Sequence, residues 1–130
     1  MATRPAFDLF GTFIHIKGES AAPLEVTEMF WKELAAGEHT ELNGGWLMTA
    51  FHMAADSPTW EVHPAGDEIL FLLSGAIAVV LQEVDSEQTI ELRTGTACVV
   101  PRGTWHRQII REPCDLLGIT FGKGTQHRPV

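Results

Sequence analysis

From Gly44 onward the chain alternates short apolar segments with turn residues. The apolar segments are four to nine residues long and rich in β-favouring residues, and glycine, proline, aspartate or serine commonly separates them. Segments of this kind predict strands. The expected strands are 46–53, 59–63, 68–73, 76–84, 88–93, 97–100, 105–111 and 115–121. Because no helical segment separates them, the pattern predicts an all-β fold, an antiparallel sandwich or barrel.

The first 45 residues have a different pattern. Apolar side chains recur at helical spacing within residues 26–36, at Val26, Met29, Phe30 and Leu34. Gly37 follows, where a helix commonly ends, so one short helix is expected here. An edge strand is expected within 9–16. The chain is therefore interpreted as a single domain, with an N-terminal extension over 1–45, a barrel over 46–122 and a loose surface tail over 123–130.

Composition and charge narrow the class of function. The chain has 130 residues, with 17 acidic against nine basic side chains and a formal charge of −8. A net negative charge opposes binding to nucleic acid or to an anionic membrane surface. The N-terminal residues lack the apolar stretch of a signal peptide, so a cytoplasmic protein is expected. Cys98 and Cys114 are then expected to remain thiols.

One stretch brings polar side chains to the end of two predicted strands. Side chains alternate across a strand, so Glu61 and His63 project to the same face. Residues 64–67, Pro-Ala-Gly-Asp, then turn the chain, and Glu68 begins the next strand. Leu70 and Leu72 share the face of Glu68 and are expected to line an apolar pocket. A carboxylate and an imidazole thus reach the mouth of the predicted interior together.

A second stretch places another imidazole at a strand end. Pro101 ends one predicted strand, Gly103 eases the turn, and His106 lies at the start of the following strand. Gln108 shares the facing of His106 and is expected to line the pocket. His52 is a further candidate for the pocket lining, although core packing is the default for its face of the strand.

The two stretches resemble the paired motifs of the cupin superfamily, G-x5-H-x-H-x3-4-E-x6-G and G-x5-P-x-G-x2-H-x3-N. The second motif matches from Gly95 to His106 and misses only the final Asn, where Ile110 stands. The first motif matches at His63, Glu68 and Gly75. It departs at its leading glycine and at its first histidine, which is replaced by Glu61.

This resemblance implies a jelly-roll barrel, or double-stranded β-helix, with one divalent metal ion inside. Carried over by motif position, His63, Glu68 and His106 are the implied ligands. Glu61 occupies the place of the missing histidine and could coordinate through a carboxylate oxygen. The alternative for Glu61 is a carboxylate that only hydrogen-bonds to a neighbour.

Coordination chemistry supports the same set. Two imidazoles and a carboxylate form the facial set of non-haem Fe(II) oxygenases, and they also suit Mn, Ni or Zn. A second carboxylate would favour Mn or Fe. The metal therefore stays open among these four.

The leading hypothesis is a small metal-binding cupin that acts on a small molecule, with a metal-dependent dioxygenase as the first candidate. Two alternatives stay open: a non-catalytic module that binds a small ligand or metal, and a metal-free acid/base isomerase or epimerase. Family members commonly pair through an outer sheet, which implies a homodimer. Outward-facing apolar residues within 69–80, including Phe71, would lie in that interface.

Overall fold

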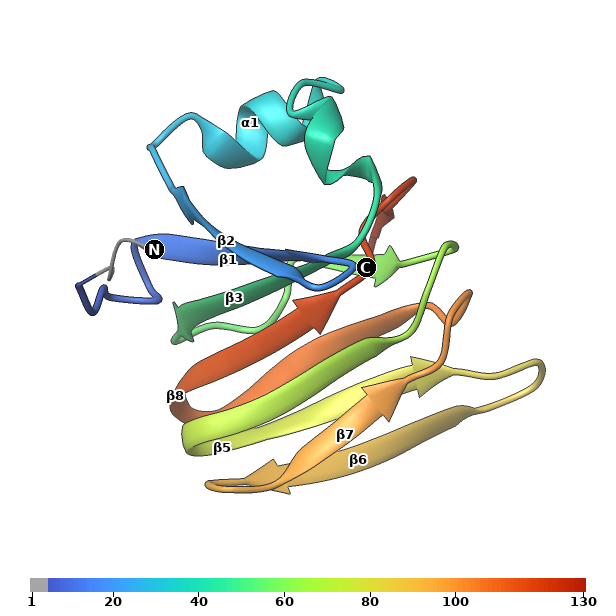
Figure 1. The fold of residues 1–130 in the computed structure, drawn as a ribbon. Coiled ribbons are helices and arrows are strands. Elements are labelled where there is room, and N and C mark those ends of the chain that lie inside the picture. Colours follow the sequence, from blue (N-terminus) through green and yellow to red (C-terminus); the bar gives the residue numbers. More distant parts are fainter. Residues whose placement is uncertain (1–4) are drawn as a thin grey trace.

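The computed structural model describes residues 5–130 (Figure 1). Within these residues the chain forms nine strands, one short α-helix (α1) and one 3-10 turn (η1). In chain order they are β1 (Thr12–Lys17), β2 (Ser20–Glu25), α1 (Phe30–Ala35), η1 (Thr40–Asn43), β3 (Trp46–Met53), β4 (Thr59–Val62), β5 (Glu68–Gln82), β6 (Glu87–Arg93), β7 (Ala97–Val100), β8 (His106–Thr120) and β9 (Gln126–Pro129). The predicted all-β class is confirmed.

Two long strands organise the barrel. β5 and β8 pair antiparallel along their length, from Glu68 opposite Thr120 to Leu81 opposite His106. Both strands fold back on themselves, at the left of Figure 1, where the register shifts between Leu72 and Ile77. Because of this bend, both ends of β5 and both ends of β8 lie at the same end of the barrel.

The bend divides one continuous sheet into two layers. The first layer runs β2-β1-β3-β8-β5-β7, using the second half of β8 and the first half of β5. The second layer runs β9-β4-β8-β5-β6, using the other halves of the two long strands. Apolar side chains from both layers meet in one buried cluster: Leu70, Leu72, Ile77, Val79, Leu81, Leu92, Val100, Cys114 and Leu116. This is the jelly-roll arrangement.

The predicted breaks within the long strands are wrong. Segments 68–73 and 76–84 belong to the single strand β5, and 105–111 and 115–121 belong to β8. Gly75 and Pro113, the residues that suggest turns, lie together at the bend. There they change the register of the pairing without ending the strands.

The N-terminal extension adds β1 and β2 to the edge of the first layer, with α1 above them (Figure 1). The expected strand within 9–16 is confirmed as β1, whereas β2 was not predicted. The helix is shorter than 26–36: the N–H of Val26 donates to the carbonyl of Gly11, 3.0 Å away, and extends the strand pairing, and the helix begins only at Phe30. In α1 the buried Phe30 packs edge-on against Phe13.

The C-terminal residues are not a loose tail. Residues 126–129 form β9, which pairs antiparallel with β4 and places His127 opposite Glu61. The expectation of a free surface segment is therefore wrong for these residues. In the part of the chain that the structure describes, no helix has the length and hydropathy that crossing a membrane requires.

Candidate metal centre

Four titratable side chains converge at the end of the barrel opposite the bend. Glu61 lies on β4 and His63 directly follows that strand, while Glu68 begins β5 and His106 begins β8. One ligand atom from each residue lies within 4.8 Å of the others. His63, Glu68 and His106 are only 5%, 6% and 1% exposed. The structure thus brings together the three candidate ligands that the motifs imply and Glu61, for which the sequence left two roles open.

Carboxylates and imidazoles alternate within the cluster. Nε2 of His63 lies 2.7 Å from Oε1 of Glu61 and 3.1 Å from Oε2 of Glu68. Nε2 of His106 lies 3.0 Å from Oε1 of Glu68. Each carboxylate therefore faces at least one imidazole nitrogen, and all of these atoms point toward a common centre.

Hydrogen bonds on the outer side fix which imidazole nitrogen faces the centre. Nδ1 of His106 lies 3.0 Å from the carbonyl oxygen of Thr104, which can only accept, so Nδ1 carries the proton. Nδ1 of His63 lies 2.8 Å from Oγ1 of Thr125. The Thr125 hydroxyl donates its proton to the carbonyl of Gly122, so it accepts from His63. In the neutral ring of either histidine, Nε2 then presents a lone pair to the centre.

The carboxylates strongly perturb the histidines, and the histidines perturb the carboxylates. Burial opposes charge on His63, but Glu61 and Glu68 outweigh it and raise the pKa of His63 to about 9. Burial likewise opposes charge on Glu68, but the two imidazoles outweigh it and lower the pKa of Glu68 to about 2. The same balance raises the pKa of His106. The cluster therefore keeps its carboxylates ionised and attracts positive charge.

The residues fit a divalent metal ion. Nε2 of His63 is buried and has no well-aligned hydrogen bond, although two carboxylate oxygens lie beside it. In the neutral form its lone pair would face those oxygens, which is unfavourable unless a proton or a cation lies between them. Oε2 of Glu68 also accepts a hydrogen bond from Oγ1 of Thr120 at 2.7 Å, which orients the carboxylate. Two imidazoles and two carboxylates suit Fe, Mn, Ni or Zn.

The residues predicted to line the pocket do not all lie beside the four candidate ligands. Leu70 and Leu72 follow Glu68 along β5 into the buried apolar cluster, and Leu72 lies where the bend begins. Gln108 accepts a hydrogen bond from Oγ of Ser57 at 2.5 Å, so its side chain holds the loop between β3 and β4.

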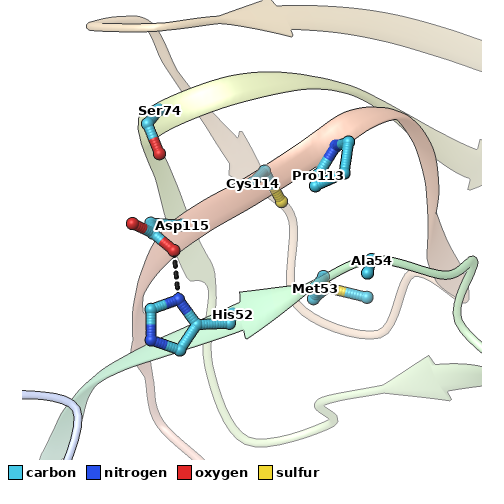
Figure 2. A pocket seen from close by; sticks show the side chains of 7 residues that line it. All are labelled: His52, Met53, Ala54, Ser74, Pro113, Cys114 and Asp115. Atoms are coloured by element: carbon cyan, nitrogen blue, oxygen red, sulfur yellow. Dashed lines mark hydrogen bonds and ion pairs between the residues drawn. The ribbon is translucent and has the colours of Figure 1, made fainter.

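His52 lies outside the barrel interior, contrary to expectation. It is exposed, pairs with Asp115, and stacks on Phe10 with ring centroids 4.3 Å apart. Its neighbours Phe51 and Met53 pack on the core instead, so the inward face of β3 is the opposite one. His52 and Asp115 line a surface depression of about 420 Å³ at the bend. Figure 2 shows the two side chains pointing toward each other. That depression lies at the other end of the barrel from the metal centre.

Two residues of the C-terminal segment were missed as parts of the site. Thr125 accepts the hydrogen bond from His63, and Nε2 of His127 donates to Oε2 of Glu61 at 2.7 Å. His127 was treated as a surface residue, and its side chain is indeed 53% exposed. Only the pairing of β9 with β4 brings it to the cluster.

The cysteines do not supply a reactive thiolate at the centre. Burial, together with the charge of Glu68, raises the pKa of Cys98 to about 11. Burial also raises the pKa of Cys114. Both are free thiols, as the sequence predicts, and both are protonated at neutral pH.

Solved structures with this fold include metabolic enzymes. A cupin-2 domain containing protein from Shewanella frigidimarina aligns with a TM-score of 0.50 and 22% identity, over 57% of this chain and 68% of that one. Oxalate oxidase in complex with glycolate aligns at 0.55 and 20%, over 62% and 45%. Hydroquinone 1,2-dioxygenase from Sphingomonas sp. TTNP3, with 4-hydroxybenzoate bound, aligns at 0.51 and 19%, over 58% of each chain. The matches therefore span less than two thirds of either enzyme, and at these identities they establish the fold alone.

Comparison with curated proteins gives no match. The match to a protein family is extensive: residues 48–128 fit the family described as Cupin domain. This range covers more than half of the chain and includes both motifs, all four ligands of the candidate centre and most of β9. The chain belongs to the cupin family.

Proposed function

We propose that this chain binds one divalent metal ion through Glu61, His63, Glu68 and His106 and uses it on a small molecule. The observation that carries the proposal is the convergence of two imidazole Nε2 atoms and two carboxylates within 4.8 Å of one another. The ion would be Fe, Mn, Ni or Zn. When bound, it would act as a Lewis acid on a substrate oxygen and stabilise negative charge there.

The side chains of the centre differ in burial, and this difference gives the site a fixed inner side and an accessible outer side. Glu68 and His106 are buried, and Thr120 and Thr104 hold them, so they form the fixed inner side. The Glu61 side chain is about one-third exposed and lies on the solvent side. A small molecule would enter past Glu61, and the buried apolar side chain of Leu70, two residues after Glu68 on the same strand face, would exclude water behind it.

A dioxygenase is the first candidate for the reaction. The motif-derived part of the ligand set, two imidazoles and one carboxylate, is that of non-haem Fe(II) oxygenases. Oxalate oxidase and hydroquinone 1,2-dioxygenase, which share the fold, support oxidation of a small oxygen-bearing acid or phenol. Two carboxylates would offset the charge of a divalent ion, which favours substrates of low negative charge.

Metal content and oxygen uptake test this function. Elemental analysis of protein purified without an affinity tag is expected to give about one Fe, Mn, Ni or Zn per chain. An oxygen electrode is then expected to record uptake with at least one compound of a panel of small phenols and diketones. Stoichiometric metal without uptake on any compound would favour the binding module. Absence of metal after incubation with each of the four ions would contradict the proposal and favour the acid/base isomerase.

We also propose that the protein is a homodimer that pairs through the outer face of its first layer. An uncharged row of apolar side chains crosses five strands of that face: Val99, Ile69, Ile119, Met48 and Ile14. Phe71 and Leu117 form part of the neighbouring row. A second copy would cover the apolar surface that this face leaves exposed.

Light scattering is expected to give twice the chain mass of 14.3 kDa. Val99→Glu is expected to produce a monomer, because it places a charge within the apolar row, where Val99 is 55% exposed. Val84→Glu is the matched control, since Val84 is 97% exposed in the turn between β5 and β6. A monomeric wild-type protein would contradict the proposal.

A further inference from the structure

The C-terminal segment supports two of the four candidate ligands, the buried His63 and the partly exposed Glu61. Thr125 accepts from Nδ1 of His63, and its hydroxyl is itself anchored to the carbonyl of Gly122, 2.8 Å away. His127 donates to Glu61 from the directly opposite position on β9. The inner ligands Glu68 and His106 are instead held by Thr120 and Thr104. The four ligands therefore have two separate sets of supports.

His127 determines how Glu61 faces the centre. Oε1 of Glu61 lies 2.7 Å from Nε2 of His63, whereas Oε2 lies 2.7 Å from Nε2 of His127. A carboxylate with one oxygen held by an imidazole N–H presents its other oxygen to an ion. Glu61 is also the ligand that departs from the cupin motif, and its side chain is the most exposed of the four. Because packing restrains this side chain least, a hydrogen bond from outside the centre has the largest effect on its orientation.

We propose that His127 is a positioning residue of the metal centre, which holds Glu61 as a one-oxygen ligand and couples metal binding to the pairing of β9 with β4. This inference rests on the proposed metal-binding function. Its basis is that one short strand supplies the partner of Glu61 and is preceded by the partner of His63. Because linkage is reciprocal, an ion that fixes Glu61 and His63 also stabilises residues 122–130.

Co²⁺ titration of the full chain tests the role of His127, with calorimetry for affinity and the visible absorption spectrum for coordination. His127→Ala is expected to weaken Co²⁺ binding about 10- to 100-fold, as loss of an outer partner of a ligand commonly does. It is also expected to change the spectrum, because Oε2 of Glu61 becomes free to coordinate. His127→Gln, whose amide can still donate, is expected to recover most of the affinity and the wild-type spectrum.

His52→Ala is the matched control. His52 is also an exposed histidine paired with a carboxylate, that of Asp115, but it lies at the bend end of the barrel. This variant is expected to bind Co²⁺ as the wild type does. Thermal melting of the metal-free variants tests whether they fold, and His127→Gln keeps the comparison usable if His127→Ala does not.

Hydrogen exchange in the wild-type protein tests the coupling without any substitution. Amides of residues 126–128 are expected to exchange more slowly when Co²⁺ is bound. Unchanged exchange would overturn the coupling, and unchanged affinity and spectrum in folded His127→Ala would overturn the positioning role. If the wild type binds no Co²⁺ at all, the proposed metal-binding function itself fails. The two failures are therefore distinguishable.

Discussion

Replacing His106 with alanine is expected to abolish stoichiometric metal binding. His106 is 1% exposed, and its Nε2 points toward Glu68, 3.0 Å away, from the buried side of the centre. The substitution removes one of the two imidazoles of the proposed centre. The loss of affinity should therefore exceed the about 10- to 100-fold that removing an outer partner costs. Elemental analysis and Co²⁺ calorimetry measure it.

Asp67→Ala provides the control for that experiment. Asp67 directly precedes Glu68, but its Oδ1 accepts a hydrogen bond from the backbone N–H of Arg102, at 2.8 Å, instead of facing the cluster. Its loss is expected to cost about 1 kcal/mol of stability or less and to leave metal binding unchanged. Circular dichroism verifies that both variants fold. A folded His106→Ala protein that keeps its metal at wild-type affinity would refute the assigned centre.

The second large effect is expected at the bend. Gly75 has a φ of +89°, and an added Cβ would lie 2.4 Å from the carbonyl oxygen of Pro113 and 2.8 Å from Cα of Cys114. Both contacts are with backbone, which cannot move without disturbing the pairing of β5 with β8. Gly75→Ala is therefore expected to lower the free energy of unfolding by about 3 kcal/mol or more. Urea unfolding measures the change.

Gly95→Ala separates the clash from the backbone conformation. Gly95 has a similar φ of +85°, but nothing lies within 4 Å of the Cβ that would be added. This substitution should cost only the conformational strain, roughly 1–2 kcal/mol. Equal losses at the two glycines would contradict the steric explanation.

The sequence was sufficient to predict the β fold and the convergence of the four side chains of the candidate centre, because their positions depend on short spacings along the chain. His63, Glu68 and His106 occupy motif positions fixed by short turns, and Glu61 lies two residues before His63 on one strand face. The continuity of β5 through Gly75 was not predictable in the same way. Glycine and proline commonly end strands, but here Gly75 and Pro113 lie at the place where the two paired strands bend together.

The outer supports escaped prediction because they arise from long-range pairing. His127 and Glu61 are 66 positions apart in the sequence. The segment that forms β9 lacks the alternation of apolar and polar residues from which a strand could have been predicted. Its outward Arg128 instead stacks over the ring of Trp105, with 4.4 Å between guanidinium carbon and ring centroid. The error at His52 has another origin: its strand was correct, but a shift of one position exchanges the inner and outer faces.

The four ligands come from both layers of the barrel, which has a mechanical consequence. Glu68 belongs to the first layer, whereas Glu61 and His106 are register partners in the second. The layers are joined covalently at both ends of the barrel, through the bend of β5 and β8 at one end and through the short turn between β4 and β5 at the other. Beside the turn, Glu68 of the first layer contacts Nε2 of His63 and of His106 from the second. An ion bound at the proposed centre would connect the two layers directly beside that turn, and it would therefore stabilise this end of the barrel against separation of the layers.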